Sequence, residues 1–103
     1  MAEWIYFLHP PRDNFAATMT DEERAAFAEH ARWLAKLLDD GVLILAGPTL
    51  GPVNTGIGIF EAPDDETARA IIAEDPVNRG GFARAELRPY QLGFLRGRDQ
   101  VRR

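Results

Sequence analysis

The chain contains no cysteine, only two histidines and no long hydrophobic run. The lack of cysteine excludes disulfide scaffolds, thiolate zinc sites, iron–sulfur clusters and a cysteine nucleophile. No stretch approaches the roughly 18 consecutive apolar residues of a membrane-spanning helix, so we expect no membrane partner. The start at Met1 shows no basic region followed by an apolar segment, so we expect no signal peptide and a cytoplasmic location.

The length and composition are typical of one globular domain, with 103 residues of which 46% are hydrophobic and 27% charged. A chain of this size buries roughly 65% of its unfolded surface, which is enough for a core without disulfides or metal. We therefore expect a single domain at residues 1–97 that needs no cofactor. A basic C-terminal tail is expected at 98–103.

Charge is unevenly distributed along the chain. Residues 1–78 hold five basic and fourteen acidic side chains, whereas residues 79–103 hold seven arginines and two acids. Such an imbalance in a small domain can accompany nucleic-acid binding. The alternatives are a basic strand and tail that meet the acidic body of a partner subunit, or that steer an anionic substrate.

The spacing of apolar and structure-breaking residues predicts four strands and two helices. The strands are expected at 3–9, 42–46 and 57–61, with the last one within 82–94. The helices are expected at 20–40 and from 63 to about 75, and loops at 12–19 and 77–82. Thr20 and Glu23 form a capping box at the start of the first helix, and Gly41 supplies its left-handed stop. The apolar face of this helix is expected to consist of Phe27, Ala31, Leu34 and Leu38.

The order βαββαβ is typical of a ferredoxin-like α+β fold, a four-stranded antiparallel sheet with two helices on one face. Pro89 within the last predicted strand favours an edge position or a bulge. The second face of the sheet needs a cover, and the usual cover is another copy of the chain. We therefore predict a homodimer that packs sheet against sheet through Trp4, Tyr6, Phe60, Leu92 and Phe94.

Two side chains suggest acid–base chemistry. His30 lies on or beside the apolar face of the first helix, where it is either a structural histidine satisfied by one hydrogen bond or a general acid or base. Asp75 ends the second helix directly before Pro76, an unfavourable place for a carboxylate beside the helix C-terminus. It either caps the next turn or points into a cavity. Because both helices cover the same face, the two side chains are expected to approach each other, with Asp75 orienting the ring.

His9 ends the first strand and is followed closely by Arg12. His9 is either a structural residue or a substrate contact, with Arg12 as the neighbouring anion contact. Two histidines and one aspartate suffice in principle for zinc, but no second ligand stands at helical spacing from His30. We therefore expect no metal.

The glycine-rich segments do not predict a phosphate site. Gly47-Pro48, Gly51-Pro52 and Gly56-x-Gly58 match no Walker motif, and no predicted helix N-terminus follows them. The sheet also lacks the aromatic signature of an RNA-recognition module, so we expect no nucleic-acid partner.

Several of these motifs, taken in order, resemble the YCII-related domain family over about residues 3–95. The residues that carry the resemblance are Trp4, Tyr6/Phe7, His9-Pro10-Pro11, Thr18-Met19-Thr20, Glu22-Glu23, His30, Leu45-Ala46-Gly47-Pro48, Gly56-Ile57, Ile59, Asp75-Pro76, Glu86-Leu87 and Pro89. The resemblance implies a dimeric α+β barrel in which His30 and Asp75 match a pair regarded as catalytic. It also implies that one branch of the family dehydrochlorinates a chlorinated hydroxyquinol. Within these motifs, Gly47 and Pro48 are further candidates for substrate contact.

The combined prediction is a cofactor-independent lyase or isomerase that acts on a small cyclic or aromatic compound. His30 would move the proton and Asp75 would orient it. The alternatives are a small-molecule-binding or regulatory domain without turnover, and a purely structural dimer module.

Overall fold

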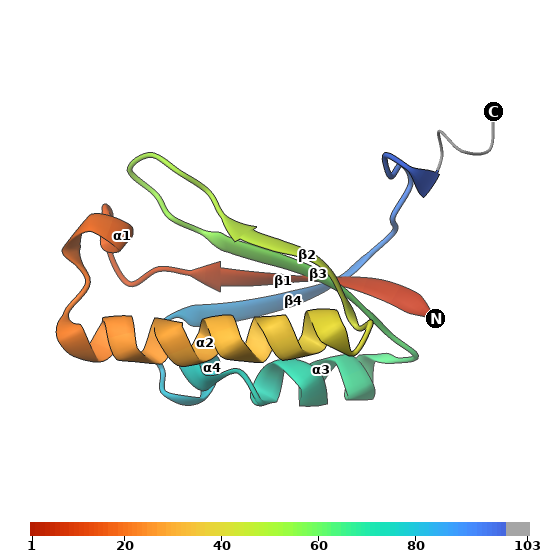
Figure 1. The fold of residues 1–103 in the computed structure, drawn as a ribbon, viewed down its shortest axis with the longest axis horizontal. Coiled ribbons are helices and arrows are strands. Elements are labelled where there is room, and N and C mark those ends of the chain that lie inside the picture. Colours follow the sequence, from red (N-terminus) through yellow and green to blue (C-terminus); the bar gives the residue numbers. More distant parts are fainter. Residues whose placement is uncertain (99–103) are drawn as a thin grey trace.

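The computed structural model describes residues 1–98 and contains one four-stranded antiparallel sheet (Figure 1). Its strands are β1 (Ala2–His9), β2 (Leu43–Pro48), β3 (Gly56–Ala62) and β4 (Arg84–Tyr90), in the spatial order β2-β3-β1-β4. This is the predicted ferredoxin-like order. Apart from Arg98, the predicted basic tail at 98–103 lies outside the described residues.

Helices cover one face of the sheet (Figure 1). The two long ones are α2 (Asp21–Asp39) and α3 (Asp65–Ala73), and two short ones are α1 (Phe15–Thr18) and α4 (Pro76–Arg79). The short helices correct the prediction of plain loops at 12–19 and 77–82. Each has four residues, so a helical periodicity has no room to show in the sequence.

The predicted signals set the ends of α2. The Thr20 hydroxyl accepts from the Glu23 backbone N–H at 3.1 Å, and the Thr20 N–H donates to the Glu23 carboxylate at 2.8 Å. Gly41 has a φ of 76°, the left-handed conformation that only glycine adopts without strain. The capping box and the stop are therefore confirmed.

The inward face of α2 is rotated from the prediction. Its partly buried hydrophobic residues that pack against the core are Ala26, Phe27 and Trp33, whereas Ala31 is exposed and Leu38 is 56% exposed. The predicted apolar face was therefore wrong in part. Residues three positions and four positions away from Phe27 define two overlapping faces on an alanine-rich helix. His30 lies in the middle of the observed face.

The core lies between the sheet and the helices, where Trp4 pairs across the sheet with Phe60. Trp4, Tyr6 and Phe60 pack there with Ala68, Ile72 and Val77. The prediction that Trp4, Tyr6 and Phe60 lie on the other face of the sheet was therefore wrong. Both alternating residue sets of β1 are apolar, so the two-residue period of a strand does not reveal which set faces the helices.

The helix-free face of the sheet, called the open face below, carries the other set. Its apolar residues are Ile5, Phe7, Leu45, Ile57 and Ile59. Strand β4 is an edge strand, as Pro89 predicted, and it lies within the predicted range 82–94 and ends at Tyr90. Leu92 and Phe94 therefore lie beyond the strand, and Phe94 is 93% exposed.

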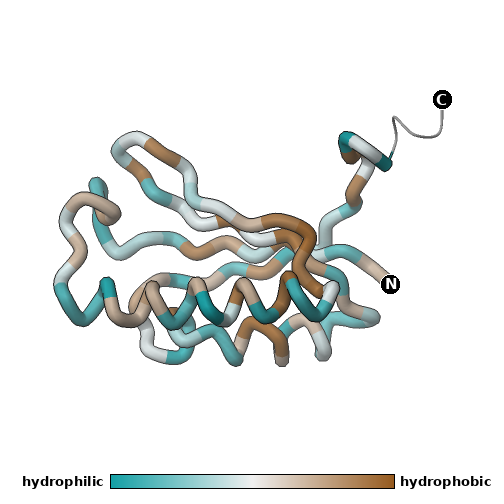
Figure 2. The backbone as a smooth tube through the Cα atoms, in the orientation of Figure 1, coloured by the Kyte–Doolittle hydropathy of each residue, from teal (hydrophilic) through white to brown (hydrophobic). Residues whose placement is uncertain are grey.

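Hydropathy along the backbone follows this arrangement (Figure 2). Helix α2 alternates between hydrophilic and hydrophobic positions, whereas the chain entering β2 is continuously hydrophobic from Val42 to Leu45. Within residues 1–98, no helix has both the length and the apolar character needed to cross a bilayer.

Candidate functional site

Asp75 is the buried charged residue at the centre of the site, with an exposed fraction of 0%. It follows α3 and is the N-cap of α4, where its Oδ1 accepts from the Val77 backbone N–H at 3.0 Å. Pro76 occupies the first turn of α4, where no N–H is needed. The predicted capping role of Asp75 is therefore present.

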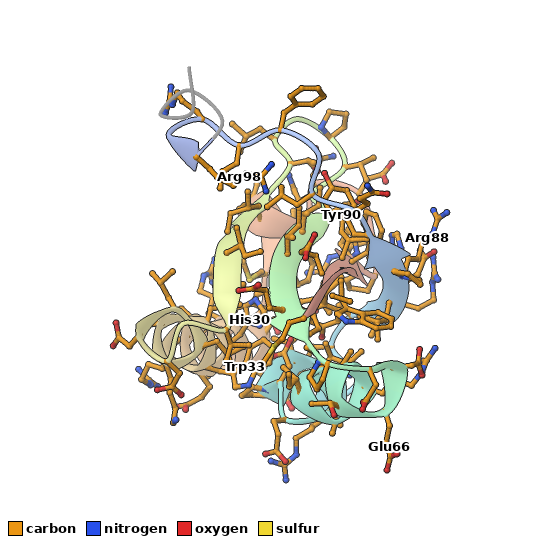
Figure 3. All side chains as sticks on the ribbon, turned by 90° about the vertical axis from the view of Figure 1, so that its right-hand side faces the viewer. His30, Trp33, Glu66, Arg88, Tyr90 and Arg98 are labelled. Atoms are coloured by element: carbon orange, nitrogen blue, oxygen red, sulfur yellow. The ribbon has the colours of Figure 1, made fainter. Side chains whose placement is uncertain are left out.

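His30 reaches the same carboxylate from α2. Its Nδ1 lies 2.8 Å from Asp75 Oδ1, and its side chain is 14% exposed. The His30 ring lies between Phe27 and Trp33, at centroid distances of 5.5 and 5.9 Å. Figure 3 shows His30 and Trp33 beneath the sheet, toward the helices. The contact predicted from the helix arrangement is therefore observed.

Tyr6 completes the cluster from β1. Its hydroxyl donates to Asp75 Oδ2 at 2.8 Å, and the side chain is buried. The pKa of the Tyr6 phenol is raised well above its ordinary value. Burial is the larger cause, and the negative charge of Asp75 is the next. Tyr6 thus stays protonated and remains a donor. Sequence reasoning missed this role because it assigned Tyr6 to the open face.

These contacts favour one tautomer of His30. An ionised carboxylate only accepts hydrogen bonds, so Nδ1 carries the hydrogen that Asp75 receives. In the neutral ring Nε2 then holds an unshared electron pair. Among residues 1–98, the structure records no hydrogen-bond partner for Nε2. The arrangement presents a base, with its orientation fixed from the opposite ring nitrogen.

His30 lines an apolar cavity of about 250 Å³, called the His30 cavity below. It lies between the helix side of the sheet, α2 and the α1 segment, and its lining consists of Tyr6, Leu8, Pro10, Phe15, Ala16, Met19, Phe27, His30, Ala31, Leu34, Ala46, Gly47, Pro48, Asn54, Gly56, Ile57, Gly58 and Ala83. The predicted substrate contacts Gly47 and Pro48 are among these residues. A cavity of about 150 Å³ already admits a benzene-sized ring, so this one accommodates a substituted single ring.

The His30 cavity has little polar lining. Asn54 is polar, but its amide is already used, since Oδ1 accepts from the Ala16 N–H and Nδ2 donates to the Thr49 and Gly51 carbonyls. Among the described residues, no Lys, Arg, Asp or Glu lines the cavity. The titratable residues of the lining are His30 and Tyr6, and the raised pKa of Tyr6 leaves His30 as the one that can exchange a proton near neutral pH.

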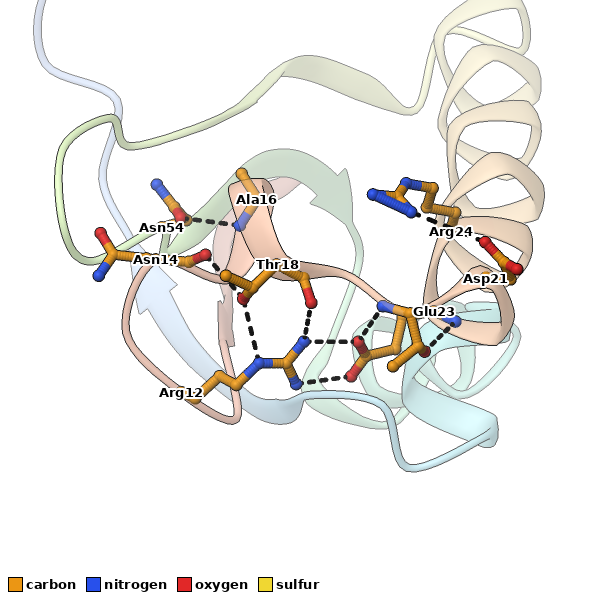
Figure 4. A network of polar contacts seen from close by, with 9 residues as sticks. Arg12, Asn14, Ala16, Thr18, Asp21, Glu23, Arg24 and Asn54 are labelled. Carbon is orange, nitrogen blue, oxygen red and sulfur yellow. Dashed lines mark hydrogen bonds and ion pairs between the residues drawn. The ribbon is translucent and has the colours of Figure 1, made fainter.

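Arg12 does not line the His30 cavity. Its guanidinium donates to both oxygens of Glu23 at 2.8 and 3.0 Å and to the carbonyl and hydroxyl of Thr18 (Figure 4). The pKa of Glu23 is lowered to about 2. The main cause is the side-chain hydrogen bond from Arg12, followed by the hydrogen bond from the Thr20 backbone N–H. Arg12 thus fastens the α1 segment to the start of α2.

His9 is also outside this cavity and extends on the open-face side of β1. Its Nε2 donates to Glu86 Oε1 at 2.8 Å, and its ring stacks on Phe7 at 5.8 Å. The hydrogen bond from His9 is the main cause that lowers the pKa of Glu86. The structure therefore does not bring together His9, Arg12 and the His30–Asp75 pair.

The metal hypothesis needs three ligands in one place. Within residues 1–98, no three His, Cys, Asp or Glu side chains form a group that could hold a metal ion.

Comparisons with known proteins agree with this fold. No curated protein matches the chain. A solved structure of 5-chloro-2-hydroxyhydroquinone dehydrochlorinase (TftG) from Burkholderia phenoliruptrix AC1100, in complex with 2,5-dihydroxybenzoquinone, is similar at a TM-score of 0.61 and 19% identity. The match covers 90% of this chain and 96% of that chain, and at this identity it shows the fold alone.

A family model extends the agreement to the sequence, because the model of the YCII-related domain matches residues 4–91. That range includes β1 from Trp4 onward, both long helices, the His30–Asp75 pair and all of β4. The chain therefore belongs to the family of YCII-related domain proteins.

Proposed function

We propose that the protein is a cofactor-independent enzyme of the lyase or isomerase type, with His30 as the general base. The supporting observation is the fully buried Asp75, which receives the His30 Nδ1–H at 2.8 Å at the wall of an apolar cavity. Asp75 orients the ring and stabilises the imidazolium that forms when Nε2 takes a proton.

The substrate class follows from the size and charge of the His30 cavity. About 250 Å³ accommodates a single substituted ring, and among the described residues no arginine or lysine is present to neutralise a carboxylate. We therefore infer a neutral cyclic or aromatic substrate with an acidic hydroxyl, or with an acidic C–H beside a carbonyl. His30 removes that proton, and the electron pair then moves into the ring system to shift a double bond or expel a leaving group.

The name and ligand of the similar structure supply the first compounds to test. 5-Chloro-2-hydroxyhydroquinone is incubated with the protein while chloride release and the ultraviolet spectrum are followed, and 2,5-dihydroxybenzoquinone is titrated as a ligand. The proposal expects chloride release, or proton exchange with deuterated water, that His30→Gln removes. If turnover is the same in wild type and His30→Gln, His30 is not the base.

The second candidate function is binding without turnover. It is favoured by the lining of the His30 cavity, which is almost entirely apolar. A ligand that quenches the fluorescence of Trp33, which packs beside His30, would report binding directly. If His30→Ala keeps full affinity and no compound is converted, the domain is a binding or regulatory module.

We also propose that two copies of the chain pack through the open face. Its residues Ile5, Phe7, Leu45 and Ile57 present apolar side chains, and Leu45 is 45% exposed in the single chain. Water contact with such a contiguous apolar surface is unfavourable, and an identical surface is a suitable cover.

A further inference from the structure

The Asp75 carboxylate has two oxygens in different environments. Oδ1 accepts from His30 Nδ1 and from the Val77 N–H, whereas Oδ2 accepts from the Tyr6 hydroxyl. The backbone bond fixes one oxygen to the start of α4. The orientation of the carboxylate plane then depends on what holds the second oxygen.

We infer that Tyr6 is a positioning residue, whose hydroxyl fixes Asp75 so that His30 keeps its hydrogen on Nδ1 and presents Nε2 to the His30 cavity. This inference rests on the proposed function for its effect on rate, but its effect on the His30 ring is measurable without any substrate.

The location of Tyr6 supports a fixed orientation. It lies on the central strand β1, opposite Gly58 and Leu87 of the two neighbouring strands. Its ring packs edge-on against Trp33 at 6.3 Å, and Trp33 in turn contacts the His30 ring. A row of contacting aromatic rings, Tyr6, Trp33 and His30, therefore links the Asp75 carboxylate to the proposed base and holds both against the sheet.

The Tyr6 phenol is a hydrogen-bond donor at neutral pH. Burial and the Asp75 charge raise the pKa of Tyr6, so the hydroxyl keeps its proton throughout the neutral range. Tyr6 therefore donates permanently to Oδ2. Without this donor, Oδ2 is a buried acceptor with no other recorded partner among the described residues, and hydrogen bonds to Oδ1 alone oppose rotation of the carboxylate about the Cβ–Cγ bond.

Tyr6→Phe removes the hydroxyl and keeps the ring. The chain offers a matched control in Tyr90→Phe, because Tyr90 is the other tyrosine, pairs with Glu3 at the end of β4 and does not line the cavity. The main readout is the tautomer of His30, measured by nitrogen-15 NMR of the imidazole. His9, the second histidine, is bonded to Glu86 and serves as an internal reference in the same spectrum.

The expected result is that His30 is protonated on Nδ1 in wild type and in Tyr90→Phe, but populates both tautomers in Tyr6→Phe. The His9 signals should stay unchanged. Where turnover is found, Tyr6→Phe should lower kcat about 10-fold with little change in KM, because the hydroxyl is bonded to Asp75 Oδ2 and acts through that carboxylate. It should have no further effect in an Asp75→Asn background.

A gentler change covers the case in which Tyr6→Phe does not fold. Fluorotyrosine incorporated into Tyr90→Phe leaves Tyr6 as the single labelled site and makes its hydroxyl a stronger donor. The Nδ1–H proton signal of His30 should then move, because Asp75 becomes a weaker acceptor. An unchanged His30 signal in both Tyr6 modifications overturns the positioning role, whereas a changed signal with no turnover of any compound overturns only the proposed function.

Discussion

His30 and Asp75 are 45 residues apart in the chain, yet Nδ1 and Oδ1 lie 2.8 Å from each other. The histidine comes from the middle of a long helix, and the aspartate caps a short helix packed beside it. The same aspartate thus stabilises the fold of α4 and fixes the histidine. The local folding of α4 and, in the proposed function, the orientation of the base depend on one carboxylate.

Replacing His30 should remove the reaction without removing the fold. We expect His30→Gln to lower turnover by roughly 10²–10⁴-fold, since a positioned general base contributes about that much. His9→Gln provides the comparison, because His9 lies outside the His30 cavity. Steady-state kinetics on both variants check this. A rise in KM for His9→Gln would instead support the sequence-based prediction that His9 contacts substrate.

Replacing Asp75 should reduce stability as well as activity. Asp75→Ala leaves the Tyr6 hydroxyl, the Val77 N–H and the His30 ring without their buried acceptor, so unfolding should become easier by about 3 kcal/mol. Urea denaturation measures the change. Asp64→Ala is the matched control, because Asp64 caps α3 through Thr67 N but is exposed, and its loss should be smaller. Equal losses would contradict the buried-network explanation.

Glu23 should make stability depend on acid pH. Its pKa is lowered from 4.5 to about 2 in the folded protein, chiefly by Arg12. A lowered folded pKa stabilises the protein above pH 4.5, and that contribution is lost as the pH falls from 4.5 toward 2. Thermal unfolding at several pH values should therefore show a shallower acid dependence for Glu23→Gln than for wild type. Glu22→Gln, exposed in the same turn, should retain the wild-type slope.

Filling the His30 cavity should block binding while the base remains intact. Ala46 of β2 lines the cavity opposite Gly58, so Ala46→Leu places three additional carbon atoms there. We expect weaker ligand binding, by about 10-fold or more, with the His30 tautomer unchanged. Ala25→Leu, on the exposed side of α2, is the matched control. Unchanged affinity in Ala46→Leu would show that ligands bind elsewhere.

A charge on the open face should separate the subunits. Phe7→Glu introduces a carboxylate among the apolar residues Ile5, Ile57 and Ile59, and we expect the dimer dissociation constant to rise by about 30-fold or more. Light scattering after size exclusion measures the mass across a concentration series. Ala28→Glu, on the exposed side of α2, should leave the mass unchanged. A wild-type protein that is monomeric at micromolar concentration would contradict the proposed dimer.

The amino-acid sequence by itself determined the order of the strands and the two long helices, the ends of α2 and the edge position of β4. Each depends on short-range chemistry, namely the Thr20–Glu23 capping box, the positive φ of Gly41 and the missing N–H of Pro89. It also singled out His30 and Asp75, because a histidine on an apolar face and a carboxylate at a helix C-terminus conflict with their surroundings.

The tertiary structure alone decided which side of β1 meets the helices, and with it the role of Tyr6. Both alternating sets of β1 are apolar, so only the pairing of Trp4 with Phe60 and the packing of α3 and α4 select the inner set. The separation of Arg12 from the His30 cavity also depends on tertiary contacts, since Glu23 and Thr18 hold its guanidinium. The sequence shows which residue types occur and how far apart they stand along the chain. The partner that satisfies a buried or charged group is set by three-dimensional packing.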